Sequence, residues 1–282
     1  MATVPVLQTL VTLLFAVQLA VLFSLGSGSN FMIGGDVLTA GESLTYKSYN
    51  LTLQSDCNLV LKNGTTSIWE TMTGGYGSGC YLTLDLNGKL SVWTRYGYAV
   101  WTSRTVSQVG TYCLVLRYDG TLHIYGPRLW TSPSSLALPL NTTTGAGLLG
   151  WPKTTDSVLY SGDVAPIGTT IANGNNELTL LDDCNLVLTS NGNPVWQTGV
   201  TDHTLHDCFV NLEANGEFRV KHWGGDILWS NGVSSPTYAE FVLVLENKYR
   251  VMLTIYGPIK WSNSQSSFRK PSVRGIEMVT AD

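Results

Sequence analysis

The sequence is short of charge and of histidine. Lys, Arg, Asp and Glu together make up 13% of the 282 residues, and the formal net charge is −4. That balance offers no basic face for nucleic acid and no polybasic patch for an anionic membrane. Only four histidines occur, and none lies at ligand spacing from a cysteine pair. The sequence therefore predicts no bound metal, no other cofactor and no nucleic-acid partner.

Catalytic signatures are also missing. The sequence contains no nucleophile elbow, no Ser/His/Asp order and no phosphate-binding loop. One acidic pair, Asp182-Asp183, falls near an expected turn with no evident partner, which is weak support for paired-carboxylate catalysis. We therefore expect a protein that is not an enzyme and has no catalytic residues.

The sequence has one long apolar run, at its N-terminus. Residues 5–25 carry no charge and approach the length of a membrane span, so a membrane anchor is one interpretation. The extreme N-terminal position, and the small residues Gly26 to Ser29 that follow, favour a cleaved signal peptide over residues 1–28. We expect a secreted or vacuolar protein that has no membrane contact after cleavage.

Three sequons bear on the same expectation. They begin at Asn50, Asn63 and Asn141, and each is a glycan acceptor if the chain enters the secretory pathway. Asn141 is the most plausible acceptor, because it lies in a Thr- and Gly-rich connector.

An internal repeat organises the remainder of the chain. LTLQSDCNLVL at 51–61 returns as LTLLDDCNLVL at 178–188, with nine of eleven letters identical. The repeat predicts two copies of one domain, each of about 110 residues and large enough for its own core. We place the domains at 29–132 and 157–262. A linker, 133–156, joins them, and a tail without strand pattern, 263–282, follows.

Each domain copy contains a shorter repeat. Short alternating segments are broken by hairpin signals such as Asn87-Gly88 and Asn215-Gly216, and no stretch after residue 30 shows a helical period. This pattern predicts an all-β fold in which each domain packs three small antiparallel sheets around a common axis. A tryptophan ends each unit and is expected to fill the core between sheets: Trp69, Trp101, Trp130, Trp196, Trp229 and Trp261.

The five cysteines follow the domain repeat. Cys57 and Cys80 occupy matched positions with Cys184 and Cys208, which in a secretory chain predicts one disulfide per domain. A metal site is the alternative, but it needs clustered ligands that the sequence does not provide. Cys113 is left over on an alternating strand, where we expect a buried free thiol.

A polar row accompanies the first repeated segment. If residues 51–62 form one strand, alternation turns the leucines and Cys57 toward the core. A carboxylate, two amides and a valine suit a pyranose, because they bind adjacent hydroxyls and a C–H face. Spacing alone favours a plainer interpretation, an ordinary solvent-facing strand. The opposite face would carry, about 7 Å apart, Gln54, Asp56, Asn58, Val60 and Lys62.

The row closely resembles the Q-x-D-x-N-x-V-x-Y signature of the bulb-type (snowdrop-like) monocot mannose-binding lectins. The resemblance covers about residues 30–132 and 156–262 and implies two tandem β-prism II domains, each with three pseudo-threefold-related sheets and one disulfide. It implies that Gln54, Asp56 and Asn58 hold mannose hydroxyls while Val60 packs on the ring. It also implies a homo-oligomer as a further expectation, because members of the family often dimerise by exchanging C-terminal strands.

The other pockets implied by the family pattern depart from the signature. In the second domain, Leu181 replaces the glutamine and cannot make its hydrogen bonds. In each domain, the second pocket of the family pattern matches the signature at no position. The third pocket of the second domain keeps only Tyr256. We expect a single mannose pocket, in the first domain. The weaker candidate residues are Lys62, which replaces the signature tyrosine, Asp119, Tyr125, Asp183, Asn185 and Val187.

Two functions compete on this evidence. The first is a secreted lectin that binds mannose or mannose-containing glycans and glycoproteins through the first pocket. The second is a lectin-related storage or defence protein that has lost simple sugar binding, or that recognises a complex glycan or a protein.

Overall fold

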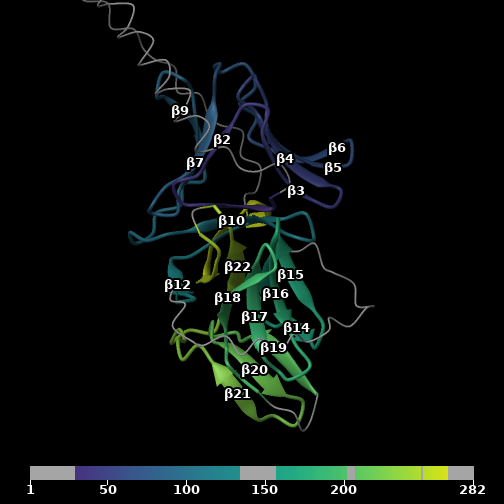
Figure 1. Ribbon diagram of the computed structural model, residues 1–282. Helices are drawn as coiled ribbons and strands as arrows, with labels where there is room; N and C mark the ends of the chain where they lie inside the picture. Colours follow the sequence, from purple (N-terminus) through teal and green to yellow (C-terminus); the bar gives the residue numbers. More distant parts are fainter. Residues whose placement is uncertain (1–28, 134–156, 202–206, 249, 266–282) are drawn as a thin grey trace, which may run out of the picture.

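The computed structural model describes residues 29–133, 157–201, 207–248 and 250–265 (Figure 1). These residues form short β-strands and one 3-10 helix, η1 (Asn263–Gln265), with no α-helix among them. Nothing helical in this part of the chain is long and apolar enough to cross a membrane. The predicted signal peptide, nearly all of the linker and most of the tail lie outside the described residues, as does Asn141.

Three four-stranded antiparallel sheets make up the first prism, which we call prism 1. The first sheet is β2 (Val37–Thr39), β7 (Tyr81–Leu84), β8 (Leu90–Trp93) and β9 (Ala99–Thr102). The second is β3 (Ser43–Tyr46), β4 (Tyr49–Leu53), β5 (Leu59–Asn63) and β6 (Thr66–Glu70). The third is β1 (Phe31–Ile33), β10 (Cys113–Leu116), β11 (Leu122–Tyr125) and β24 (Ile259–Ser262).

Prism 2 repeats this arrangement with three further antiparallel sheets. One is β14 (Val164–Pro166), β19 (Cys208–Leu212), β20 (Phe218–His222) and β21 (Ile227–Ser230). Another is β15 (Thr170–Asn173), β16 (Asn176–Leu180), β17 (Leu186–Ser190) and β18 (Asn193–Gln197). The last is β12 (Arg128–Thr131), β23 (Met252–Tyr256), β22 (Val242–Glu246) and β13 (Val158–Tyr160). The predicted all-β fold of two three-sheet prisms is confirmed.

Each prism has its own core, built from one residue in two along its strands. In prism 1 the inward leucines of β4 and β5, such as Leu51 and Leu61, are fully buried. Burial of such a side chain stabilises the fold by about 1.5–3 kcal/mol. The predicted disulfides, Cys57–Cys80 and Cys184–Cys208, are both present. Cys113 is a buried free cysteine, as expected.

The two prisms exchange their last strands. β12, which precedes the linker, pairs with β23 in prism 2, and β24, the last strand of the chain, pairs with β11 in prism 1. The sequence pattern grouped Trp130 with the first copy and Trp261 with the second, and that grouping is wrong. Trp261 packs edge-on against Trp69 and Trp101, at centroid distances of 6.2 and 6.1 Å.

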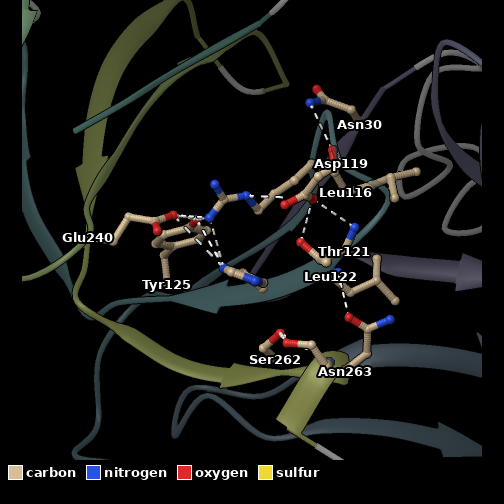
Figure 2. Close-up of polar contacts among 12 residues, drawn as sticks. Asn30, Leu116, Asp119, Thr121, Leu122, Tyr125, Glu240, Ser262 and Asn263 are labelled. Atoms are coloured by element: carbon tan, nitrogen blue, oxygen red, sulfur yellow. Dashed lines mark hydrogen bonds and ion pairs between the residues drawn. The ribbon is translucent and has the colours of Figure 1, made fainter. Parts of the chain in front are cut away.

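The same exchange supplies prism 2. Trp130 lies 6.4 Å from both Trp196 and Trp229, again edge to face. The tail expected from residue 263 onward also begins with structure, because it continues β24. Asn263 Oδ1 accepts from the backbone N–H of Leu122 at 2.9 Å, which fixes η1 against prism 1 (Figure 2).

The third sheets of the two prisms pack against each other. Their inner faces belong to the two cores, and their outer faces form a third apolar cluster that contains Val115 and Tyr125 from prism 1 with Val244 and Tyr256 from prism 2. Ser157 donates to Asn30 Oδ1 across this contact at 2.7 Å. Figure 1 shows the two prisms one above the other, with β10, β12 and β22 in the region where they meet.

Candidate functional site

The residues of the predicted row lie at a turn rather than along one strand. β4 ends at Leu53 and β5 begins at Leu59, so residues 54–58 reverse the chain between them. Gln54 N–H donates to Asn58 O at 2.8 Å, and Cys57 has a positive φ of 76°. The prediction of a single strand over 51–62 is therefore wrong. The alternation of polar and apolar residues is present, but Ser55, Asp56 and Asn58 are also residue types that favour turns.

Asn58 holds this turn to the neighbouring strand. Its side-chain oxygen accepts from the hydroxyl of Thr71 at 3.1 Å and from the N–H of Thr73 at 3.2 Å. Its amide donates to Glu70 Oε2 at 2.6 Å. The side chain is 9% exposed, so these bonds satisfy most of what a buried amide requires. Asn58 is thus a structural residue of the turn, with one amide hydrogen left beyond these bonds.

Asp56 is the most open member of the row. Its Oδ1 accepts from the N–H of Asn58 at 3.0 Å, while the residue as a whole is exposed. Gly75 N–H donates to the Asp56 backbone oxygen at 2.9 Å and draws the following loop over the turn. A Cβ at Gly74 would lie 2.8 Å from Asp56 Oδ2. Glycine at that position therefore keeps the second carboxylate oxygen uncovered.

The other members of the row flank this carboxylate. Val60 is only 4% exposed and lies directly opposite Glu70 in the sheet, so both side chains belong to one face. Gln54 and Lys62 are half-buried. The structure thus brings Gln54, Asp56, Asn58 and Val60 together around one turn, with an acceptor-only carboxylate, two amides and an apolar floor.

Three residues of this site were missed in the sequence. Glu70, Thr71 and Thr73 come from β6 and the loop after it, and together they anchor the turn. Thr73 also donates its hydroxyl to Cys57 O at 2.7 Å. The available signal was the polar stretch after each tryptophan, SIWET at 67–71 and PVWQT at 194–198, which recurs at the domain spacing.

Prism 2 reproduces the turn but not the row. Asn185 Oδ1 accepts from Thr198 Oγ1 at 3.0 Å and from Gly199 N–H at 3.1 Å, and its amide donates to Gln197 at 3.1 Å. Asp183 accepts from Asn185 N–H at 3.0 Å, as Asp56 does in prism 1. Val187 is buried at 8% exposure. The position of Gln54 is taken by Leu181, which has no polar group to offer.

The third pocket of prism 1 is occupied by prism 2. Tyr125 is fully buried, and its hydroxyl donates to Glu240 (Figure 2). Arg117 forms an ion pair with the same carboxylate and also donates to Tyr125 Oη at 3.0 Å. Asp119 accepts from the backbone and the hydroxyl of Thr121. Burial, followed by the hydrogen bond to Glu240, raises the pKa of Tyr125. This tyrosine therefore belongs to the contact between the prisms and does not face a sugar.

The third pocket of prism 2 is closed in a similar way. Tyr256 is 1% exposed, and its hydroxyl donates to Glu246 Oε1 at 2.8 Å. Lys248 forms an ion pair with Asp36 of prism 1. Burial raises the pKa of Glu246 and, together with nearby acidic groups, that of the Cys113 thiol. Polar groups on both third sheets therefore serve the contact between prisms.

The fold and the turn geometry define a class, a two-domain lectin fold of tandem β-prisms. The chain is 33% identical to a mannose-specific lectin 2 of Colocasia esculenta over 84% of this chain and 86% of that one. It is also 33% identical to a mannose-specific lectin 2 of Crocus vernus over 91% of this chain and 95% of that one. No family model matches the sequence.

A solved structure agrees with these relatives. The native fetuin-binding agglutinin of Scilla campanulata, a two-domain lectin, superposes with a TM-score of 0.71 at 29% identity. The match covers 83% of this chain and 100% of that one. The chain belongs to the bulb-type monocot mannose-binding lectin family.

Proposed function

We propose that this protein is a lectin that binds mannose or mannose-containing glycans through one pocket, at the β4–β5 turn of prism 1. The observation that carries the proposal is the Asp56 carboxylate, exposed and left uncovered by Gly74, between the half-buried Gln54 and the buried Val60. Relatives whose names state mannose specificity support the choice of sugar.

Each residue has a distinct role in this proposal. Asp56 accepts hydrogen bonds from neighbouring sugar hydroxyls, and Gln54 both donates and accepts. Asn58 contributes the amide hydrogen that the turn does not use. Val60 forms an apolar floor under the C–H face of the ring. Binding depends on the placement of hydrogen bonds and breaks no bond of the ligand, so the proposed activity is non-enzymatic.

The proposal includes a route through the secretory pathway to the cell exterior or the vacuole. The uncharged run at 5–25 and two disulfides support it, because disulfides persist in oxidising compartments. One pocket per chain also means that multivalent adhesion requires a homo-oligomer, through which weak sites gain avidity.

Retention on mannan resin tests the sugar site. We expect the full chain to be retained and to elute with methyl α-mannoside, and we expect Asp56→Ala to pass through. Asp183→Ala is the matched control, because it removes the same turn acceptor from prism 2 and should leave retention unchanged. Equal retention of Asp56→Ala and the unmodified chain would refute the pocket.

A second candidate function rests on a different observation. Lys62 stands where the family signature has tyrosine, and Glu70 holds part of the Asn58 amide, so simple mannose makes fewer contacts here. This arrangement favours a lectin-related storage or defence protein that binds a complex glycan or a protein. A glycan array separates the two functions: mannose-terminated glycans alone support the first, and other glycans or none support the second.

A further inference from the structure

An exposed aromatic surface lies beside the first pocket of prism 1. Three tyrosines make it up, and we call them the tyrosine surface: Tyr76, Tyr96 and Tyr98, which are 60%, 68% and 72% exposed. Contiguous exposed apolar surface marks a binding site, whereas singly scattered exposed side chains need no explanation. The contacts of the loops that carry these residues connect the surface to Asp56.

Tyr76 belongs to the loop that packs on the β4–β5 turn. Gly75 N–H donates to Asp56 O at 2.9 Å, and Tyr76 is the next residue, whose own N–H donates to Thr73 O at 3.2 Å. Thr73 in turn donates its N–H to Asn58 Oδ1 at 3.2 Å. Consecutive Cα atoms are about 3.8 Å apart, so Tyr76 starts within a few ångströms of the Asp56 turn.

The other two tyrosines come from the turn between β8 and β9, which packs on the same loop. A Cβ at Gly77 would lie 3.3 Å from Cys57 Sγ and 2.6 Å from Thr94 Cγ2, so the loop is wedged between the two turns. Arg95 N–H donates to Ser78 O at 3.4 Å. These contacts join the β8–β9 turn to the β4–β5 turn through this loop.

Local contacts hold part of the surface in place. Arg95 donates to Tyr96 Oη at 2.6 Å, and its guanidinium lies 4.7 Å from the centre of the Tyr96 ring. The backbone N–H of Thr94 donates to Tyr98 O at 2.9 Å, which closes the turn that carries both tyrosines. A rigid tyrosine binds at low cost in conformational entropy, and the arginine has further donors for hydroxyl groups.

The paired tyrosines of the β8–β9 turn occur in the prism that keeps Gln54. Counting back from Trp101 in prism 1 and from Trp229 in prism 2, the counterparts of Tyr96 and Tyr98 are Gly224 and Asp226. The same turn of prism 2 instead carries Trp223, which is 60% exposed and whose ring centre lies 4.4 Å from that of Phe209. Prism 2, in which leucine replaces the glutamine, therefore lacks these two tyrosines.

We propose that the tyrosine surface is a subsite for the second and later sugar units of a glycan whose first unit occupies the Gln54–Val60 pocket. The inference rests on the proposed function and specifies its ligand as a neutral oligosaccharide. The faces of the tyrosine rings contact C–H faces of the sugar, and their hydroxyls with the Arg95 donors bind sugar hydroxyls.

Titration of the full chain with methyl α-mannoside and with mannopentaose tests the subsite. The unmodified chain is expected to bind mannopentaose at least about tenfold more tightly. Tyr76→Ala, and the double variant Tyr96→Ala/Tyr98→Ala, should each weaken mannopentaose by about three- to tenfold and leave methyl α-mannoside unchanged, given the usual strength of an aromatic contact. The corresponding phenylalanine variants should keep most of the affinity.

Tyr238→Ala is the control, because Tyr238 is 83% exposed on prism 2 and should affect neither ligand. If Asp56→Ala abolishes binding while the tyrosine variants bind mannopentaose as tightly as the unmodified chain, the subsite is refuted and the proposed function stands. If the unmodified chain binds neither sugar, or Asp56→Ala binds both unchanged, the proposed function fails and the subsite fails with it.

Discussion

The β4–β5 turn of prism 1 and the β16–β17 turn of prism 2 are held by the same asparagine in the same way. The oxygen of Asn58 accepts from a threonine hydroxyl and a backbone N–H, and so does that of Asn185. The turns differ in their first residue, which is Gln54 in one and Leu181 in the other. The asparagine therefore stabilises the turn in both prisms, while sugar recognition depends on the side chains that the turn does not use for its own hydrogen bonds.

The third sheets extend the comparison. Their outer faces hold pocket positions in the family pattern, yet Tyr125 and Tyr256 are buried where the prisms meet. Placement in the molecule, as well as residue identity, therefore decides which pockets are open. Substitutions at matched positions of the two prisms test this contrast.

The exchanged tryptophans give the largest effect. Both rings are partly buried against their cores. Trp261→Ala should destabilise prism 1, and Trp130→Ala should destabilise prism 2, by about 3 kcal/mol each, the lower end of the range for removal of a large aromatic side chain. Hydrogen exchange followed by mass spectrometry checks which prism loses protection. Loss of protection in the β16–β17 hairpin upon Trp261→Ala would contradict the exchange of strands.

The two asparagines should behave alike in stability. Asn58→Ala and Asn185→Ala each leave a backbone N–H and a threonine hydroxyl short of an acceptor, at a cost of about 2 kcal/mol. Urea unfolding of both variants measures the effect. A destabilised Asn58→Ala beside an unaffected Asn185→Ala would show that the two turns are not equivalent.

The first residue of the turn should affect sugar binding and leave the stability of the fold unchanged. Gln54→Leu makes prism 1 resemble prism 2 and should weaken mannose binding more than tenfold, because one donated and one accepted hydrogen bond are lost, at roughly 1 kcal/mol each. Leu181→Gln is the reciprocal change and should add weak binding to prism 2. Calorimetric titration measures both, and unaltered affinity in Gln54→Leu would remove glutamine from the site.

The smallest effect concerns pH at the third sheet of prism 1. Burial, and then Arg117, lower the pKa of His123, while Glu240 and Asp119 oppose the shift. The unfolded chain therefore takes up this proton first as the pH falls, so stability is lost below about pH 6.5. Thr254 occupies the matching position in prism 2. Thermal unfolding of His123→Gln should depend less on pH between 7 and 5 than that of the unmodified chain.

The fold could be predicted from the sequence because the internal repeats mark the same strand and core positions in each sheet. Leucines at alternate positions, the cysteine pairs and the six tryptophans each have one consistent place in a three-sheet prism. The exchange of strands was not predicted, because a strand satisfies the same pattern in either prism. One signal of the interface was present: the runs at 113–116 and 242–245 are apolar without interruption, which indicates strands buried on both faces.

The sequence predicted which residues gather at the site, but it did not predict their geometry. Gln54, Asp56, Asn58 and Val60 do gather, but around a reversal at Cys57 that a strand pattern cannot indicate. The role of Asn58 also depends on Glu70 and Thr73, twelve and fifteen residues later. Such partners become visible only when β5 and β6 are paired.

Backbone amide NMR during titration with methyl α-mannoside shows directly whether one pocket per chain binds mannose. Shifts are expected in the amides of 54–60 and of Thr73 to Gly75, with none in 181–187. Equal shifts at both turns, or shifts confined to prism 2, would contradict this expectation.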